Sequence, residues 1–258
     1  MATVIAVANQ KGGVGKTTTA VNLAASLAAA EKRTLLVDVD PQANASSGVG
    51  VRAGMAELDL YDALAERATL REVIVETEVP GLHLAPSSQN LVGMELELID
   101  AEDRATRLRD LIATIEDDYD FVIMDCPPSL GLITINALSA AHQVLVPMQC
   151  EYYSLEGLTQ LMATIERVRE LYNPRLTVAG IVLTMFDSRN SLTHQVAAEV
   201  RDHFHVFDAI IPRNVKLSEA PSHGKPVLLY DIDCKGAQGY LSLARELLLA
   251  AAQPATET

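Results

Sequence analysis

The residues with the clearest chemistry lie near the start of the chain, in the run Lys11-Gly12-Gly13-Val14-Gly15-Lys16-Thr17-Thr18. Glycines let backbone N–H groups turn inward toward an anion, and a helix that follows adds the positive end of its dipole. Lys16 can reach the β- and γ-phosphates of a nucleotide, and the Thr17 hydroxyl can bind Mg²⁺. The run therefore predicts a phosphate-binding loop, although Gln10 replaces the first glycine of the usual G-x-x-x-x-G-K-[ST] pattern.

A second lysine, Lys11, precedes the glycines. A lysine in a loop that wraps phosphate is costly if it is buried without a partner. We therefore expect it to meet phosphate, either in its own subunit or in a second subunit. A glycine-rich turn with incidental lysines is the alternative, but an apolar run at residues 4–8 and an Ala/Leu-rich segment at residues 19–30 give the loop its strand and helix.

Carboxylates follow two further apolar runs. Asp38 and Asp40 come after residues 34–37, where alternation along a strand would turn both to one side. One could touch Mg²⁺ through water, and the other could orient an attacking water; two solvated acids in a turn are the alternative. Asp125 ends the run 120–125, which is the Walker B arrangement, and can hold Mg²⁺ directly or through water.

The elements that must position these groups alternate along the chain. Apolar runs predict strands at residues 4–8, 34–37, 81–86, 120–125, 143–148, 176–185 and 208–211. Helical patterns occupy residues 19–30, 58–66, 70–76, 108–115, 132–141, 154–171, 192–204 and 236–252, whereas residues 44–54 read as a loop. Strands that are apolar throughout favour an α/β fold, a doubly wound, mostly parallel sheet with helices on both faces. No linker interrupts residues 1–258, so we expect a single domain.

Composition limits the function. The formal net charge of −14 argues against a surface covered with nucleic-acid-binding cations. Residues 185–226 nevertheless balance their charges, with five basic and five acidic side chains, so a local patch remains open. Three distant cysteines without a C-x-x-C pair indicate reduced thiols in the cytoplasm. No apolar run reaches the roughly 18 residues that a membrane span needs.

These motifs resemble the ParA/MinD ATPases. The form K-G-G-x-G-K-[ST] at the loop resembles their deviant Walker A loop, and D-x-D-P-Q (38–42) and D-x-P-P (125–128) resemble the segments that follow two of their strands. Residues 211–226 are similar to the segment I-P-R-N-x-x-L-S-E-A-P-S-x-G-K-P of chromosomal ParA proteins, which narrows the resemblance to that branch.

The resemblance implies a role for each matching residue. It assigns water activation to Asp40, contact with the adenine to Pro212 and Arg213 with Asn214 beside them, and DNA contact to Arg189 and Lys216, for which solvated loop cations are the alternative. It also implies that Lys11 reaches across a two-fold axis to the partner's phosphates. The expected sites are catalytic Lys11, Lys16 and Asp40; ATP-binding Lys11, Gly12, Gly13, Val14, Gly15, Lys16, Thr17, Thr18, Pro212, Arg213 and Asn214; Mg²⁺-binding Thr17, Asp38 and Asp125; and DNA-binding Arg189 and Lys216.

The expected function is an ATP-dependent dimerising switch that binds DNA non-specifically and hydrolyses ATP slowly. With a ParB-like partner it would drive chromosome or plasmid segregation on the nucleoid. A MinD-like positioning ATPase on a membrane or protein array is the alternative, but the helix at 236–252 carries Arg245 and no lysine, so it lacks the cationic face for stable membrane binding. A metabolic transferase of the nitrogenase iron-protein or dethiobiotin-synthetase type is disfavoured. A bridging iron–sulfur cluster needs paired cysteines after the Walker B strand, and only Cys126 and Cys150 lie near that strand.

Overall fold

The fold is taken from a computed structural model that describes residues 1–52, 54–151 and 154–252. Residues 53, 152–153 and 253–258, which the predicted domain includes, lie outside this description. Eight strands form one sheet in the order β3-β4-β2-β5-β1-β6-β7-β8, and every neighbouring pair is parallel except β3 with β4. The strands are β1 (Thr3–Val7), β2 (Thr34–Asp38), β3 (Val75–Glu76), β4 (Leu82–Ala85), β5 (Phe121–Asp125), β6 (Gln143–Gln149), β7 (Thr177–Phe186) and β8 (Val206–Pro212).

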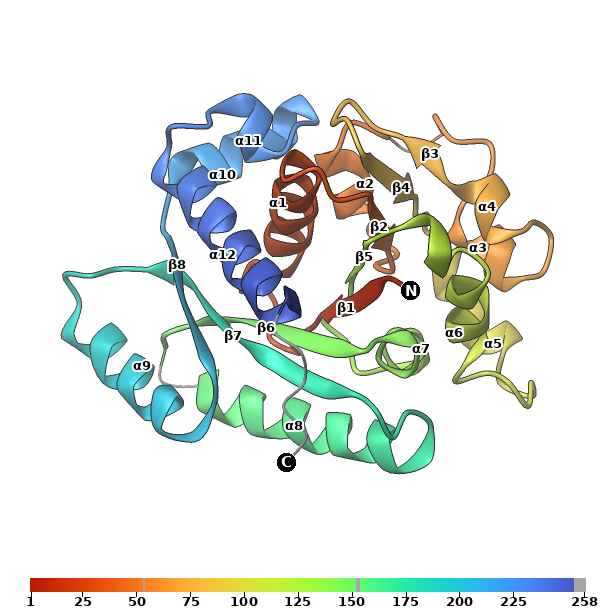
Figure 1. Cartoon of the computed structure of the whole chain (residues 1–258). Coiled ribbons are helices and arrows are strands. Elements are labelled where there is room, and N and C mark those ends of the chain that lie inside the picture. Colours follow the sequence, from red (N-terminus) through yellow and green to blue (C-terminus); the bar gives the residue numbers. More distant parts are fainter. Residues whose placement is uncertain (53, 152–153, 253–258) are drawn as a thin grey trace.

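Helices cover both faces of this sheet (Figure 1). The α-helices are α1 (Lys16–Ala29), α2 (Asn44–Gly48), α3 (Leu60–Leu64), α4 (Leu70–Val73), α5 (Leu91–Glu97), α6 (Arg107–Ala113), α7 (Leu132–Ala140), α8 (Ser154–Leu171), α9 (Ser191–His203), α10 (Val215–Glu219), α11 (Val227–Tyr230) and α12 (Lys235–Ala252). Two 3₁₀ turns, η1 (Glu116–Asp118) and η2 (Ala220–His223), complete the described elements. The predicted doubly wound, mostly parallel fold is confirmed.

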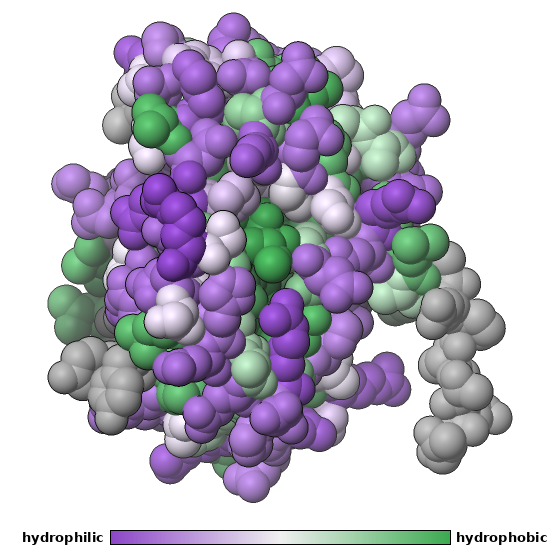
Figure 2. Space-filling view, turned by 90° about the vertical axis from the view of Figure 1, so that its left-hand side faces the viewer, coloured by the Kyte–Doolittle hydropathy of each residue, from purple (hydrophilic) through white to green (hydrophobic). Residues whose placement is uncertain are grey.

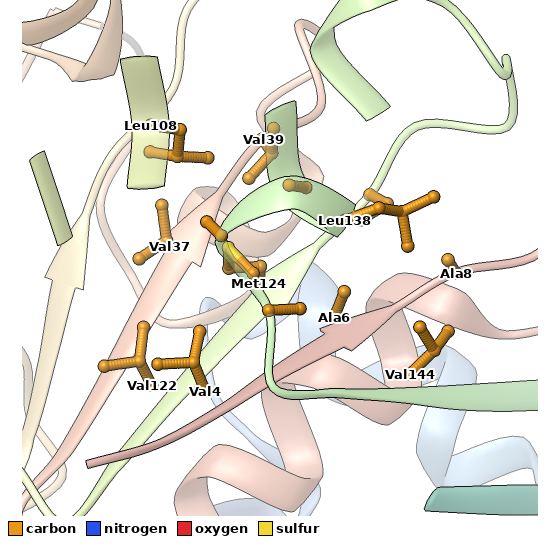
Figure 3. Close-up of a cluster of buried hydrophobic side chains, with 14 of the residues drawn as sticks. Val4, Ala6, Ala8, Val37, Val39, Leu108, Val122, Met124, Leu138 and Val144 are labelled. Carbon is orange, nitrogen blue, oxygen red and sulfur yellow. The ribbon is translucent and has the colours of Figure 1, made fainter. Parts of the chain in front are cut away.

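Alternation along the buried strands builds a core on each face. On β1, Val4 and Ala6 join the cluster that includes side chains of α6 to α9, whereas Ile5 and Val7 join the cluster beneath α1 and α12. Figure 3 shows the first cluster, in which side chains of β1 and β5 meet Leu108 of α6 and Leu138 of α7. The last helix, α12, is therefore a core element, and no helix of the described residues is long and apolar enough to cross a membrane.

Several short segments differ from the sequence-based expectations. Residues 44–48 form helix α2 inside the predicted loop, because Asp38 accepts hydrogen bonds from the Ser46 N–H and hydroxyl and so fixes this turn on the sheet. The predicted helix 70–76 ends at Val73, and Val75–Glu76 pairs with β4 as the antiparallel edge strand β3. Helices α5, α10 and α11 were not predicted. The first two differences depend on bonds to a neighbouring strand, which the hydrophobic pattern of the segment itself does not indicate.

Register brings the predicted motifs to one edge. Val7 at the end of β1 lies beside Asp125 at the end of β5, and Asp125 lies beside Asp38 at the end of β2. Open α/β sheets bind ligands outside the carboxyl ends of their strands, at the point where the strand order reverses. The segments that follow β1, β2 and β5 therefore form the place to look for a site.

Candidate active site

The glycine-rich loop connects β1 to α1 in a shape that depends on glycine. Gly13 and Gly15 have φ angles of 75° and 89°, in the left-handed region that side chains with a Cβ avoid. Gly15 is the N-terminal cap of α1, so the helix begins at Lys16 and its first N–H groups are directed at the loop. Gly12 and Gly13 are exposed and line a cavity, whereas the Val14 side chain is buried.

Two residues that the sequence analysis did not select hold this loop from outside. The Asn9 side chain accepts a hydrogen bond from the Lys11 N–H at 3.0 Å and donates one to the Pro147 carbonyl at 2.8 Å. Thr184 on β7 donates from its hydroxyl to the Val14 carbonyl at 2.7 Å. Asn9 lies three residues before Gly12, where a polar residue after an apolar run is a weak local signal, but nothing local distinguishes Thr184 from other strand threonines.

The two lysines of the loop have different surroundings. Lys16 is buried and lines the cavity, and its Nζ donates to the Lys11 carbonyl at 3.0 Å. Burial lowers the pKa of Lys16, while the carboxylate of Asp125 pulls it upward. The Lys11 side chain does not line the cavity; its Nζ forms an ion pair with Glu151 at 2.6 Å. Lys16 can therefore act on a phosphate in its own subunit, whereas Lys11 is directed elsewhere.

The carboxylates of Asp38 and Asp125 are fully buried side by side at the ends of β2 and β5. Burial raises the pKa of Asp38 to about 6, although hydrogen bonds from Ser46 lower it. Burial also raises the pKa of Asp125 well above its ordinary value, and repulsion from Asp38 adds to this effect. The Thr17 hydroxyl lies near Asp125 and lowers the pKa of that carboxyl. Nevertheless, neither carboxylate oxygen of Asp125 has a hydrogen bond of normal geometry among the described residues.

An unpartnered buried carboxylate beside a threonine hydroxyl is a donor set that suits Mg²⁺, which prefers oxygen ligands and retains several waters. Asp125 and Thr17 therefore fit the predicted metal role. Asp38 differs, because its Oδ2 accepts from the Ser46 N–H and hydroxyl and its Oδ1 accepts from the Asp40 N–H. Among the described residues no three His, Cys, Asp or Glu side chains gather as a ready-made metal cluster.

Asp40 lines the cavity, but strand alternation does not place it there. Strand β2 ends at Asp38, so strand alternation does not orient Asp40. Instead, its N–H donates to Asp38 at 3.2 Å, and its Oδ1 accepts from the Gln42 N–H at 2.9 Å. The side chain is 7% exposed and contributes to the cavity wall. This placement suits a carboxylate that accepts a hydrogen bond from a water molecule.

The cavity has a volume of about 480 Å³, within the range of small-molecule sites. Its lining includes candidate residues from the sequence analysis, namely Gly12, Gly13, Gly15 to Thr18, Asp40, Pro212, Arg213 and Asn214. It also includes residues that were not predicted: Gln42, Asn44, Pro128, Thr184, Met185, Ile211, Leu217, Ser218 and Tyr240. Met185 has a φ of 48°, a strained conformation of the kind found at functional sites. Figure 2 faces this edge of the sheet and shows a hydrophobic spot amid hydrophilic side chains.

The two predicted DNA-binding cations lie near this edge but are neutralised within the chain. Arg189, in the connection from β7 to α9, pairs with Asp187 at 3.1 Å and is 88% exposed. Lys216 on α10 pairs with Glu219 at 3.0 Å and lies over the Tyr230 ring at 5.3 Å. Arg213, in the cavity wall, is close enough to Asp187 to lower the pKa of that carboxyl, although its pairing with Arg189 is the larger cause.

Several known proteins are similar to this chain over most of its length. A family model described as an AAA domain matches residues 2–178. The chain is 54% identical to the chromosome partitioning protein ParA of Myxococcus xanthus, over 95% of this chain and 87% of that protein. It is 50% identical to the sporulation initiation inhibitor protein Soj of Bacillus subtilis, over 96% of this chain and 98% of that protein. The cobyrinic acid a,c-diamide synthase of Mycobacterium smegmatis, solved with ADP and magnesium, matches with a TM-score of 0.85 at 35% identity, over 96% of this chain and 94% of that one.

High identity over nearly the whole length of these relatives, with the glycine loop, both carboxylate motifs and the Pro212–Asn214 wall at one cavity, places the chain within one branch of the P-loop proteins. The nucleotide cavity and the similarity thus lead to the same conclusion: the chain belongs to the ParA/Soj family of chromosome-partitioning ATPases.

Proposed function

We propose that this chain is an Mg-ATP-dependent dimerising switch that binds DNA non-specifically and drives segregation with a ParB-like partner on the nucleoid. The observation that supports this most is that Lys16 and Asp40 line one cavity with the glycine loop, while the buried carboxylate of Asp125 lies close enough to Lys16 to raise its pKa. A phosphate chain there would meet backbone N–H groups, the helix terminus and a buried lysine.

Thr17 and Asp125 would hold Mg²⁺, which neutralises phosphate charge when bound. The ion would then interact with the buried oxygens of Asp125, which have no hydrogen-bond partner among the described residues. Lys16 would exchange the Lys11 carbonyl for phosphate oxygens. Pro212, Arg213 and Asn214 would lie along the adenine, because they line the same cavity as the glycine loop.

Asp40 would orient the water that attacks the γ-phosphate. Its Oδ1 accepts from Gln42, which leaves Oδ2 to accept from that water. Hydrolysis by this group alone would be slow, because the cations around the phosphates already act in the ground state and only interactions that strengthen in the transition state accelerate chemistry. A partner protein that improves this arrangement would therefore stimulate turnover.

Lys11 would bind the phosphates of a nucleotide held by a second subunit. Its side chain points out of its own cavity toward Glu151, and both side chains are partly exposed. When two subunits meet, phosphates bound to the partner subunit would attract Lys11 more strongly than one exposed carboxylate does. Dimerisation would then depend on the γ-phosphate, and hydrolysis would separate the subunits.

Arg189 and Lys216 would contact DNA phosphates. A single pair of cations on a chain with a net charge of −14 binds DNA weakly, but a dimer doubles the phosphate contacts. Affinity that depends on counterion release falls steeply with salt. DNA binding should therefore require ATP, be independent of DNA sequence and disappear as salt rises.

Retention of the full chain on non-specific duplex DNA, measured with ATP, with ADP and without nucleotide, tests this proposal. Retention with ATP alone, lost as salt rises, is the expected result. Retention in no state, with ATP binding and dimerisation intact, would remove DNA from the function and favour a positioning ATPase on a protein array. Equal retention in all three states would contradict the nucleotide switch.

A further inference from the structure

We infer that Ser46 and Ser87 are positioning residues for ATP hydrolysis, because their hydroxyls close a buried ring of hydrogen bonds that fixes Asp40 at the cavity. The inference rests on the proposed function, since it takes Asp40 as the group that orients water. Neither serine lines the cavity wall near the glycine loop, so neither is expected to touch ATP.

The ring joins four residues. The Ser46 N–H and hydroxyl both donate to Asp38 Oδ2 at 2.7 Å, and the Ser46 hydroxyl accepts from the Ser87 N–H at 3.1 Å. The Ser87 hydroxyl donates to the Asp40 carbonyl at 2.8 Å. The Asp40 N–H donates to Asp38 Oδ1 at 3.2 Å and closes the ring.

All four members are buried. Asp38 is 0% exposed, Ser46 2%, Ser87 6% and Asp40 7%. Hydrogen bonds are stronger away from water, and a network with every member satisfied holds its groups in one arrangement. The ring also connects three separate segments: the end of β2, helix α2 and the residues after β4. Movement of any one segment would have to break bonds to the other two.

The consequence falls on the backbone of Asp40. Its N–H is held by Asp38 and its C=O by Ser87, so both peptide groups that flank the side chain are fixed. The direction of the carboxylate then follows from the backbone and from the bond between its Oδ1 and the Gln42 N–H. Asp38 is best explained as the anchor of this ring, a role that differs from the predicted Mg²⁺ contact.

A water-orienting carboxylate is sensitive to small displacements, and a shift of 1 Å can cost about 100-fold in rate. ATP affinity depends instead on the glycine loop and Lys16, which the ring does not contact. Loss of a serine hydroxyl should therefore lower kcat and leave KM for ATP almost unchanged. A serine that only supports the fold would change thermal stability without this separation.

The experiment compares Ser87→Ala and Ser46→Ala with the parental full chain, measuring kcat and KM for Mg-ATP together with Tm. We expect kcat to fall about ten- to 100-fold in both variants with KM within about twofold. Ser87→Thr retains the hydroxyl and should restore most of kcat. Ser139→Ala is the matched control, because Ser139 is a buried serine of α7 whose hydroxyl has no partner among the described residues.

Unchanged kcat in Ser87→Ala, or a loss that Ser87→Thr does not restore, would overturn the inference. Asp40→Ala, assayed in parallel, distinguishes the proposed role of Asp40 from the positioning role of the two serines. If Asp40→Ala hydrolyses ATP at the parental rate, the proposed role of Asp40 fails. If Asp40→Ala is inactive while both serine variants are fully active, only the positioning inference fails.

Discussion

Two groups of charged side chains lie at the carboxyl edge of the sheet, and they are held in opposite ways. Asp38, Asp40, Asp125 and Lys16 are buried, with their surroundings set by adjacent strands and by the glycine loop. Arg189 and Lys216 are exposed or half-exposed, and each pairs with a carboxylate two or three residues away. The buried group is held in place by contacts within one subunit. The exposed cations form neutral ion pairs with carboxylates until a more strongly charged group, such as a DNA phosphate, replaces those carboxylates.

This difference in burial predicts that the two groups respond differently to salt. Buried electrostatic interactions are strong and little affected by salt, so the nucleotide site should keep its geometry in any buffer that preserves the fold. Exposed ion pairs are weak, and ions screen them within about 10 Å at 0.1 M salt. The exposed cations can therefore exchange partners easily, which suits a surface that engages DNA only when two copies present it together.

The largest expected effect is on Asp40. Asp40→Ala should lower hydrolysis by about 10²- to 10⁴-fold, because it removes the proposed water-orienting carboxylate, while ATP binding persists. The variant should accumulate as an ATP-bound dimer that stays on DNA. Single-turnover hydrolysis and size-exclusion chromatography with ATP measure both properties. Parental hydrolysis in this variant would mean that the buried group does not contain the catalytic carboxylate.

An intermediate effect is expected for Lys216. Lys216→Ala should reduce the slope of log DNA affinity against log salt by about one for each subunit of the dimer, with ATP affinity unchanged. A titration of DNA binding at several salt concentrations gives this slope. Lys32→Ala is a suitable control, because Lys32 precedes β2 at the opposite, amino edge of the sheet. An unchanged slope would make Lys216 an ordinary surface cation.

A small effect is expected for Glu219, the ion-pair partner of Lys216. Glu219→Gln removes the carboxylate that neutralises Lys216 and should strengthen DNA binding about twofold at low salt, since an exposed ion pair competes only weakly. Hydrolysis should not change. Weaker DNA binding in this variant would mean that Glu219 orients Lys216 toward DNA instead of competing with it. The same titration as for Lys216→Ala gives the answer.

Much of this arrangement follows from local sequence. The glycine loop, the apolar strands and Asp125 at the end of a buried run are readable because strand, loop and helix signals are contiguous there. Helix α2 and strand β3 were mispredicted because both depend on partners elsewhere, Asp38 for the first and β4 for the second. The roles assigned to Lys11, Arg189 and Lys216 remain predictions, as do the extent of the domain and the DNA and protein partners.

Local sequence therefore specifies the fold class and part of the cavity lining, because glycine geometry, hydrophobic periodicity and strand ends are properties of neighbouring residues. The way in which these residues are held depends on contacts between separate segments. Thr184 reaches Val14 across 170 positions, Ser87 reaches Ser46 across 41, and Glu151 reaches Lys11 across 140. Such bonds form between segments that come together when the sheet assembles, so no local pattern reports them.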